Sequence, residues 1–134
     1  MRRAKVKLPP RPTDVELSIL RVLWQHGPAS VREVLGRYND GRRSEAGYTT
    51  VLKMLQVMTE KGLVERDDSV RPQIYRARLS EEQTQRQLIT DLLDKAFGGS
   101  AKKLVLQALA SREASEEELA EIETLLSRLE RGTK

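Results

Sequence analysis

Apolar residues recur at steps of three and four in three successive segments of the first 62 residues, which is the spacing of amphipathic helices. Capping boxes begin the first two segments, at Thr13 with Glu16 and at Ser30 with Glu33. The pattern predicts helices that follow Thr13 and Ser30, and a third helix over about residues 47–61 that Gly62 ends. The apolar positions expected to be buried are Val15, Ile19, Val22, Leu23, Val31, Val34, Leu35, Val51, Met54, Leu55 and Met58.

After Gly62 the pattern changes to alternating apolar and polar residues, as in a half-buried strand. The segments LVER and QIYRARL, joined by DDSVRP, predict a two-stranded hairpin. Three short helices followed by a hairpin are typical of the winged helix-turn-helix, whose recognition helix enters the major groove of DNA. We therefore predict a winged-helix domain over residues 13–79, preceded by a flexible basic arm at residues 1–12.

Residues 80–134 contain three further helical patterns, with capping boxes at Ser80 and Ser115 and a break at Gly98-Gly99. A segment this short cannot bury three apolar stripes within itself, so it is expected to need a partner surface. A homodimer meets this need and matches a palindromic DNA site, whereas packing of these helices onto the N-terminal domain is the alternative. The predicted fold class is mainly α with a small β-hairpin, in which residues 80–134 form a helical dimerisation domain. Its predicted interface residues are Leu88, Leu92, Leu93, Phe97, Leu104, Leu119, Ile122 and Leu126.

The charge is distributed unevenly between the two parts of the chain. Residues 1–80 contain 16 Lys/Arg and 9 Asp/Glu, a net charge of +7, whereas residues 81–134 contain 8 and 11, a net charge of −3. The basic excess favours a polyanionic partner for the first part, although a solubilising surface would have the same charge. One histidine, no cysteine and no glycine-rich phosphate loop leave little catalytic or metal-binding chemistry, so we predict no enzyme, cofactor or metal site.

The predicted third helix has a polar face opposite its apolar stripe. On this face Gln56 suits adenine, Lys53 suits guanine or a phosphate, and a threonine methyl group suits thymine. Each residue alone would also fit a solvated helix face, but the order of elements and the charge favour DNA. The residues predicted to contact DNA are Ser30, Arg32, Arg42, Arg43, Tyr48, Thr49, Thr50, Lys53, Gln56 and Arg71.

Several of these segments resemble the penicillinase-repressor family of the BlaI/MecI type. The family's first two helices are resembled by PTDVELSILRVLW and ASVREVL. Its recognition helix and wing are resembled by YTTVLKMLQVMTEKGLVER together with YRARLS. Its C-terminal half is resembled by DKAFGGSAKKLVLQALA together with SEEELAEIETLL. The resemblance covers about residues 11–130. It implies a cytoplasmic homodimeric repressor that binds pseudo-palindromic operators with TACA/TGTA-like half-sites through the face of Thr49, Thr50, Lys53 and Gln56. It also implies a membrane sensor protease acting on the C-terminal domain.

The chain departs from that family's switches in two respects. Family members inactivated by proteolysis are cut at an Asn-Phe bond, whereas this chain has Gln107-Ala108 there, which leaves open whether proteolysis relieves repression. The cysteine hook of the copper-sensing branch is excluded because the chain has no cysteine.

No apolar run approaches the roughly 18 residues of a membrane span, so we expect no membrane insertion. The alternative function is a winged-helix protein–protein adaptor without sequence-specific DNA binding.

Overall fold

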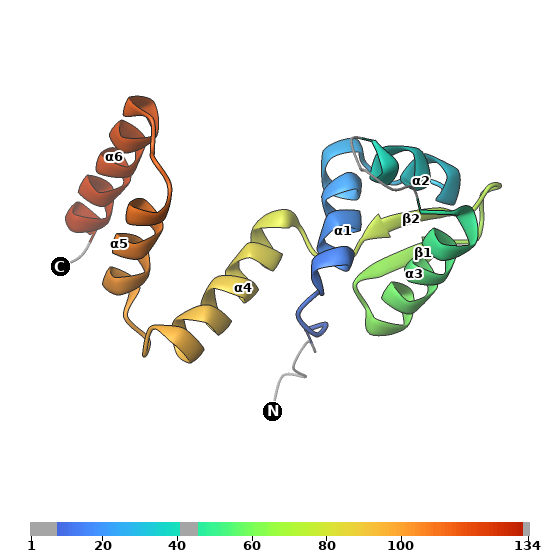
Figure 1. Cartoon of the computed structure of the whole chain (residues 1–134), viewed down its shortest axis with the longest axis horizontal. Helices are drawn as coiled ribbons and strands as arrows, with labels where there is room; N and C mark the ends of the chain where they lie inside the picture. Colours follow the sequence, from blue (N-terminus) through green and yellow to red (C-terminus); the bar gives the residue numbers. More distant parts are fainter. Residues whose placement is uncertain (1–7, 41–45, 133–134) are drawn as a thin grey trace. The chain divides into compact units, whose positions relative to one another are not determined.

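The computed structural model describes residues 8–40 and 46–132, which form six helices and one antiparallel hairpin (Figure 1). The helices are α1 (Asp14–His26), α2 (Val31–Asn39), α3 (Tyr48–Lys61), α4 (Glu81–Ala96), α5 (Ala101–Ser111) and α6 (Glu116–Gly132), and the strands are β1 (Val64–Asp67) and β2 (Ile74–Ala77). The predicted fold class is confirmed as mainly helical with a two-stranded hairpin and further helices in the C-terminal part, while the dimerisation role of that part stays a prediction. The chain divides into two compact units, Met1–Ile89 and Thr90–Lys134, and the boundary falls within α4.

Capping boxes fix the starts of four helices, as the sequence predicts. In each box the N-cap hydroxyl accepts a hydrogen bond from the backbone N–H three residues on, and the side chain there accepts one from the N-cap N–H. The pairs are Thr13 with Glu16, Ser30 with Glu33, Ser80 with Gln83, and Ser115 with Glu118. By contrast, α3 begins after Gly47 without a side-chain cap. The first N–H groups of α3 therefore have no N-cap side chain as an acceptor.

The core of the first unit lies between α1, α2, α3 and the hairpin. Its most deeply buried side chains are Ile19, Leu20, Val34, Val51, Leu55, Met58, Val64 and Tyr75. The sequence prediction was wrong at Val15, which is 43% exposed. The buried residues of α1 are instead Glu16, Ile19, Leu20, Val22 and Leu23, so that the polar Glu16 takes the first buried position. Leu35 and Met54, also predicted to be buried, pack only partly against the core.

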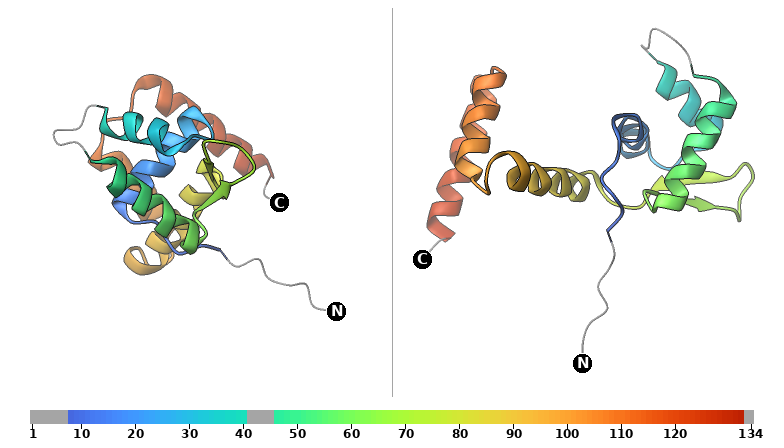
Figure 2. Two further views of the ribbon diagram at one scale, coloured as in Figure 1. Left: turned by 90° about the vertical axis from the view of Figure 1, so that its right-hand side faces the viewer. Right: turned by 60° about the horizontal axis from the view of Figure 1, so that its bottom comes forward.

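Backbone hydrogen bonds join the hairpin to the turn between α1 and α2. In the hairpin's antiparallel register, Val64 pairs with Ala77 at one end and Asp67 pairs with Ile74 next to the loop. Ala29, in the turn between α1 and α2, exchanges two backbone hydrogen bonds with Tyr75 of β2, of 2.8 and 2.9 Å. The hairpin projects from the three-helix body beyond this attachment (Figure 2). The loop-proximal half of the hairpin is thus held against the turn that leads through Ser30 into α2.

The segment before α1 is partly packed into the first unit. Pro9 and Pro12 are buried, and the side-chain N–H of Gln87 in α4 donates a 2.8 Å hydrogen bond to the carbonyl of Pro9. The predicted basic arm, residues 1–12, thus includes residues that belong to this unit's packing. Residues 1–7 of that arm lie outside the described residues.

A single ion pair joins the first turn of α1 to the last turn of α3. The Nζ atom of Lys61 lies 2.7 Å from Oε2 of Glu16, whose side chain is almost completely buried. Burial alone would raise the pKa of Glu16, but the hydrogen bonds from Lys61 and from the backbone and hydroxyl of Thr13, together with the charge of Lys61, outweigh it. The pKa is therefore below its ordinary value of 4.5. Ionised Glu16 consequently stabilises the fold.

We expect Glu16→Gln to lower the free energy of unfolding at pH 7 by about 1–2 kcal/mol, since it removes a partly screened ion pair. Because the pKa of Glu16 is lower in the folded than in the unfolded state, its contribution is present above the unfolded value and is lost as the pH falls through the folded value. Urea denaturation should therefore show that the difference between the two proteins shrinks in acid. The exposed Glu117→Gln is the control, and an equal Glu16→Gln effect at pH 7 and pH 3 would contradict this account.

Candidate nucleic-acid interface

The third helix presents an exposed polar face directly opposite its buried stripe. Its inner positions, Val51, Leu55 and Met58, are fully buried in the core. The outer face carries Thr49, Thr50, Lys53 and Gln56, all of which are exposed. Because the stripe fixes the rotation of α3 about its axis, these four side chains are held together on one surface. Their role as base-reading residues stays a prediction.

A cation–π contact joins the beginnings of α2 and α3. The guanidinium carbon of Arg32 lies 5.4 Å from the centroid of the Tyr48 ring. Such a contact contributes roughly 0.5–1 kcal/mol at an exposed site. Sequence reasoning predicted both residues as DNA contacts but had no signal for their stacking, since they lie on different helices. The contact places a positive charge beside the first turn of α3.

Asn39 fixes the end of the loop that connects α2 to α3, a role that the sequence analysis missed. Its Oδ1 atom accepts a 2.8 Å hydrogen bond from the backbone N–H of Ala46, and its Nδ2 atom donates a 2.9 Å hydrogen bond to the carbonyl of the same residue. The only sequence signal was an asparagine at a helix end, where its side chain often bonds backbone groups. The loop residues Arg42 and Arg43, predicted to contact DNA, lie outside the described residues.

The structure places the other two predicted DNA contacts in different settings. Ser30 is only 6% exposed, and its hydroxyl caps α2 by accepting the N–H of Glu33. Arg71 is exposed in the hairpin loop, which also contains Asp68 and begins directly after Asp67, the last residue of β1. Hydrogen bonds from the hydroxyl and backbone of Ser69 lower the pKa of Asp67, which keeps this carboxylate ionised. The hairpin loop is therefore closer to charge balance than the outer face of α3.

The helices of the second unit expose many apolar side chains. No residue of α5 or α6 is buried. Of the predicted interface residues, Leu92, Leu119 and Leu126 are exposed, whereas Leu88, Leu93, Phe97, Leu104 and Ile122 are half-buried. The list of predicted interface residues omitted further exposed apolar residues, namely Val105, Leu106, Leu109, Leu125 and Leu129 in this unit and Ile89 at the end of the first unit. An apolar surface of this kind is characteristic of an interaction site.

Residues 8–40 and 46–132 contain no group of three or more His, Cys, Asp or Glu side chains arranged to hold a metal ion. The same ranges contain no helix with the length and apolarity that crossing a membrane requires.

Three helices followed by a hairpin, with an exposed polar face on the third helix, define a winged helix-turn-helix protein. The family model described as penicillinase repressor matches residues 12–128 of the chain. The chain belongs to this family, which confirms the predicted relationship. Its members are transcriptional repressors rather than enzymes, as expected for this chain.

The chain is similar to three known proteins or structures. It is 24% identical to the penicillinase repressor of Bacillus licheniformis over 117 residues. This alignment covers 87% of this chain and 90% of the relative. A solution structure of Bacillus licheniformis BlaI, in monomeric form in complex with the blaP half-operator, is 23% identical, with a TM-score of 0.48, over 57% of this chain and 92% of that one. A MarR family protein from Bacillus stearothermophilus is 20% identical, with a TM-score of 0.48, over 90% of this chain and 74% of that one.

Proposed function

We propose that the protein is a homodimeric, DNA-binding transcriptional repressor that places α3 in the major groove of a pseudo-palindromic operator. The observation that carries the proposal is the exposed face of α3, backed by a fully buried stripe, in a member of the penicillinase repressor family. The curated relative is itself a penicillinase repressor and spans most of the chain. Repression follows if a dimer bound at a promoter excludes the transcription machinery.

The outer face of α3 has the chemistry that base reading requires. The amide of Gln56 can pair with the N6 and N7 atoms of adenine, and Lys53 can donate to guanine or to a phosphate. The methyl groups of Thr49 and Thr50 can pack against thymine. Contacts to the phosphates fix the register of a protein on DNA. We assign this role to Arg32, stacked on Tyr48, together with Arg42, Arg43 and Arg71.

The second unit supplies the proposed dimer interface. Two copies related by a two-fold axis would each cover the partner's exposed leucines, including Leu92, Leu119 and Leu126. Residues 81–134, which include the second unit, have a net charge of −3, and this charge would keep them away from the phosphates. Because each protomer then brings one α3 to one half-site, the operator should have two-fold symmetry. The proposed location is the cytoplasm, where bacterial promoters are accessible.

A membrane sensor protease acting on the second unit is a further element of the proposal. The peptide bond between Gln107 and Ala108 lies inside α5, and the carbonyl of Gln107 also accepts a hydrogen bond from the hydroxyl of Ser111. A protease needs an extended backbone, so cleavage at this bond would require α5 to unfold locally.

The second candidate function is a winged-helix adaptor that binds protein partners. The exposed apolar helices of the second unit favour it, because such a surface suits a protein partner as well as a second copy. An adaptor would have no preference for a DNA sequence, which separates the two functions experimentally.

Selection of bound duplexes from random DNA tests the proposed function. We expect the full chain to enrich a sequence with two inverted half-sites, whose centres lie about one helical turn or a multiple of it apart. Enrichment of a single asymmetric half-site would contradict the dimer. The absence of any enriched sequence would favour the adaptor.

A further inference from the structure

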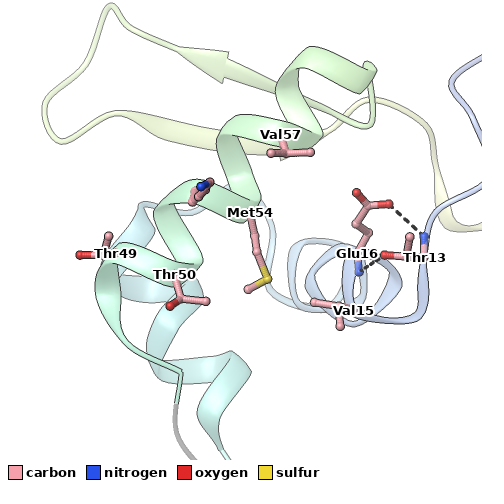
Figure 3. Close-up of a pocket in the computed structure, with 8 residues that line it drawn as sticks. Thr13, Val15, Glu16, Thr49, Thr50, Met54 and Val57 are labelled. Carbon is pink, nitrogen blue, oxygen red and sulfur yellow. Dashed lines mark hydrogen bonds between the residues drawn. The ribbon is translucent and has the colours of Figure 1, made fainter.

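A groove lies between the start of α1 and the outer side of α3, and its apolar lining residues Val15, Met54 and Val57 have no role in the proposed function. It has a volume of about 420 Å³, within the range of small-molecule sites. Met54 and Val57 point from α3 toward Val15 and Glu16 of α1 (Figure 3). Val15 and Val57 are 43% and 37% exposed, respectively, and neither belongs to the buried core. The groove therefore has an apolar wall that water covers in the free protein.

The polar side of the groove favours a negative charge. Glu16 lines it, but its carboxylate is neutralised by Lys61 at 2.7 Å and also accepts the N–H of Thr13 at 2.9 Å. Lys53 lines the same groove and has no ion-pair partner among the described residues. The hydroxyl groups of Thr49 and Thr50 complete the lining. The ammonium group of Lys53 is thus the lining charge that a ligand can neutralise.

We propose that this groove binds a small organic anion with an apolar body, of the aryl-alkyl carboxylate class, and that this ligand competes with operator DNA. The apolar body would cover Val15, Met54 and Val57, while the carboxylate would accept hydrogen bonds from Lys53. Burial of apolar surface supplies most of the affinity, and the charged hydrogen bond orients the ligand.

Competition follows from the shared residues and rests on the proposed function. Thr49, Thr50 and Lys53 line the groove and are also three of the four residues assigned to base reading. A ligand seated there would occupy the surface of α3 that must enter the major groove. By linkage, DNA and ligand must weaken each other's binding by the same factor. The protein would thereby release its operator without proteolysis.

The ligand site can be tested without DNA, by an NMR titration of the full chain with 4-phenylbutyrate. We expect saturable shifts confined to the backbone amides of residues 13–16 and 49–57, with a dissociation constant on the order of 1 mM for a ligand of this size. The neutral 4-phenylbutyramide should bind about fivefold more weakly. Shifts confined to the second unit, or no saturation at about ten times the expected dissociation constant, would overturn the proposal.

Three variants assign the binding to the groove. Val15→Ser should weaken binding about threefold, since it removes apolar contact area, whereas the matched Val105→Ser, at another exposed valine on α5, should leave it unchanged. Lys53→Met should abolish the difference between the carboxylate and the amide. Equal effects of the two valine variants, or an anion preference that survives Lys53→Met, would place the ligand elsewhere.

The regulatory claim is tested with a duplex enriched by selection. At ten times its dissociation constant, 4-phenylbutyrate should raise the apparent dissociation constant of the duplex by at least about tenfold, whereas sodium acetate at the same ionic strength should not. Binding of 4-phenylbutyrate in the groove without release of the duplex would overturn the competition. If the protein binds no duplex at all, the proposed function fails, while the NMR titration still decides the ligand site.

Discussion

Replacing Lys53 and Gln56 together by alanine is expected to lower affinity for the operator by more than about 100-fold and affinity for unrelated duplex by less than about tenfold. Each good contact to a base edge contributes roughly 1–3 kcal/mol of discrimination, and both half-sites lose the two contacts. Non-specific affinity depends mainly on phosphate neutralisation, and the variant removes only one positive charge from each protomer, so this affinity should fall little. Neither residue is part of the core, since both are exposed on α3. The fold and the dimer should therefore be unaffected.

A matched control uses the same two residue types elsewhere on the chain. Lys103 and Gln107 are exposed on α5, and their joint replacement by alanine removes the same total charge and the same amide group. We expect this variant to bind operator and unrelated duplex as the wild type does. If the α3 variant loses affinity equally for both kinds of duplex, α3 does not read the bases.

Leu126→Glu is expected to convert the dimer into monomers at micromolar concentration. Leu126 is 54% exposed in the isolated chain and belongs to the apolar surface assigned to the interface. Loss of one buried leucine costs about 2–3 kcal/mol, and an isologous interface loses it twice, so the dissociation constant of the dimer should rise by about 1000-fold or more. Operator affinity should fall by at least about 100-fold, because each monomer then holds a single half-site. Sedimentation velocity and operator titration measure the two effects.

The neighbouring residue provides the control for the introduced charge. Ser127 is exposed on α6, so Ser127→Glu adds the same carboxylate one residue away from the predicted contact. This variant should remain dimeric and should bind the operator normally. A Leu126→Glu protein that sediments as a dimer would show that the interface lies elsewhere on the chain.

Local signals made much of the fold predictable. The capping boxes at Thr13, Ser30, Ser80 and Ser115 involve residues only three apart, so the sequence alone located four helix starts. The period of the apolar residues likewise located the exposed face of α3. Both signals arise within one or two helical turns, where the covalent chain already determines which side chains meet.

Contacts between distant residues could not be predicted in the same way. The indole N–H of Trp24 donates to the carbonyl of Leu79 at 3.0 Å, and Gln87 donates to the carbonyl of Pro9 at 2.8 Å, across separations of 55 and 78 residues. Nothing in the local pattern links these pairs. Val15 was wrongly predicted to be buried for a related reason, since the buried neighbour is Glu16, whose ion-pair partner Lys61 lies on another helix.

Salt-dependent titration of the selected operator duplex, with a scrambled duplex of the same composition beside it, tests the central claim most directly. A dimer that neutralises six to ten phosphates should give a plot of log K against log salt concentration with a slope between about −5 and −9. The selected duplex should bind at least about 1000-fold more tightly than the scrambled one. Equal affinity for both duplexes, or no binding to either at low salt, would contradict a repressor that reads its operator through α3.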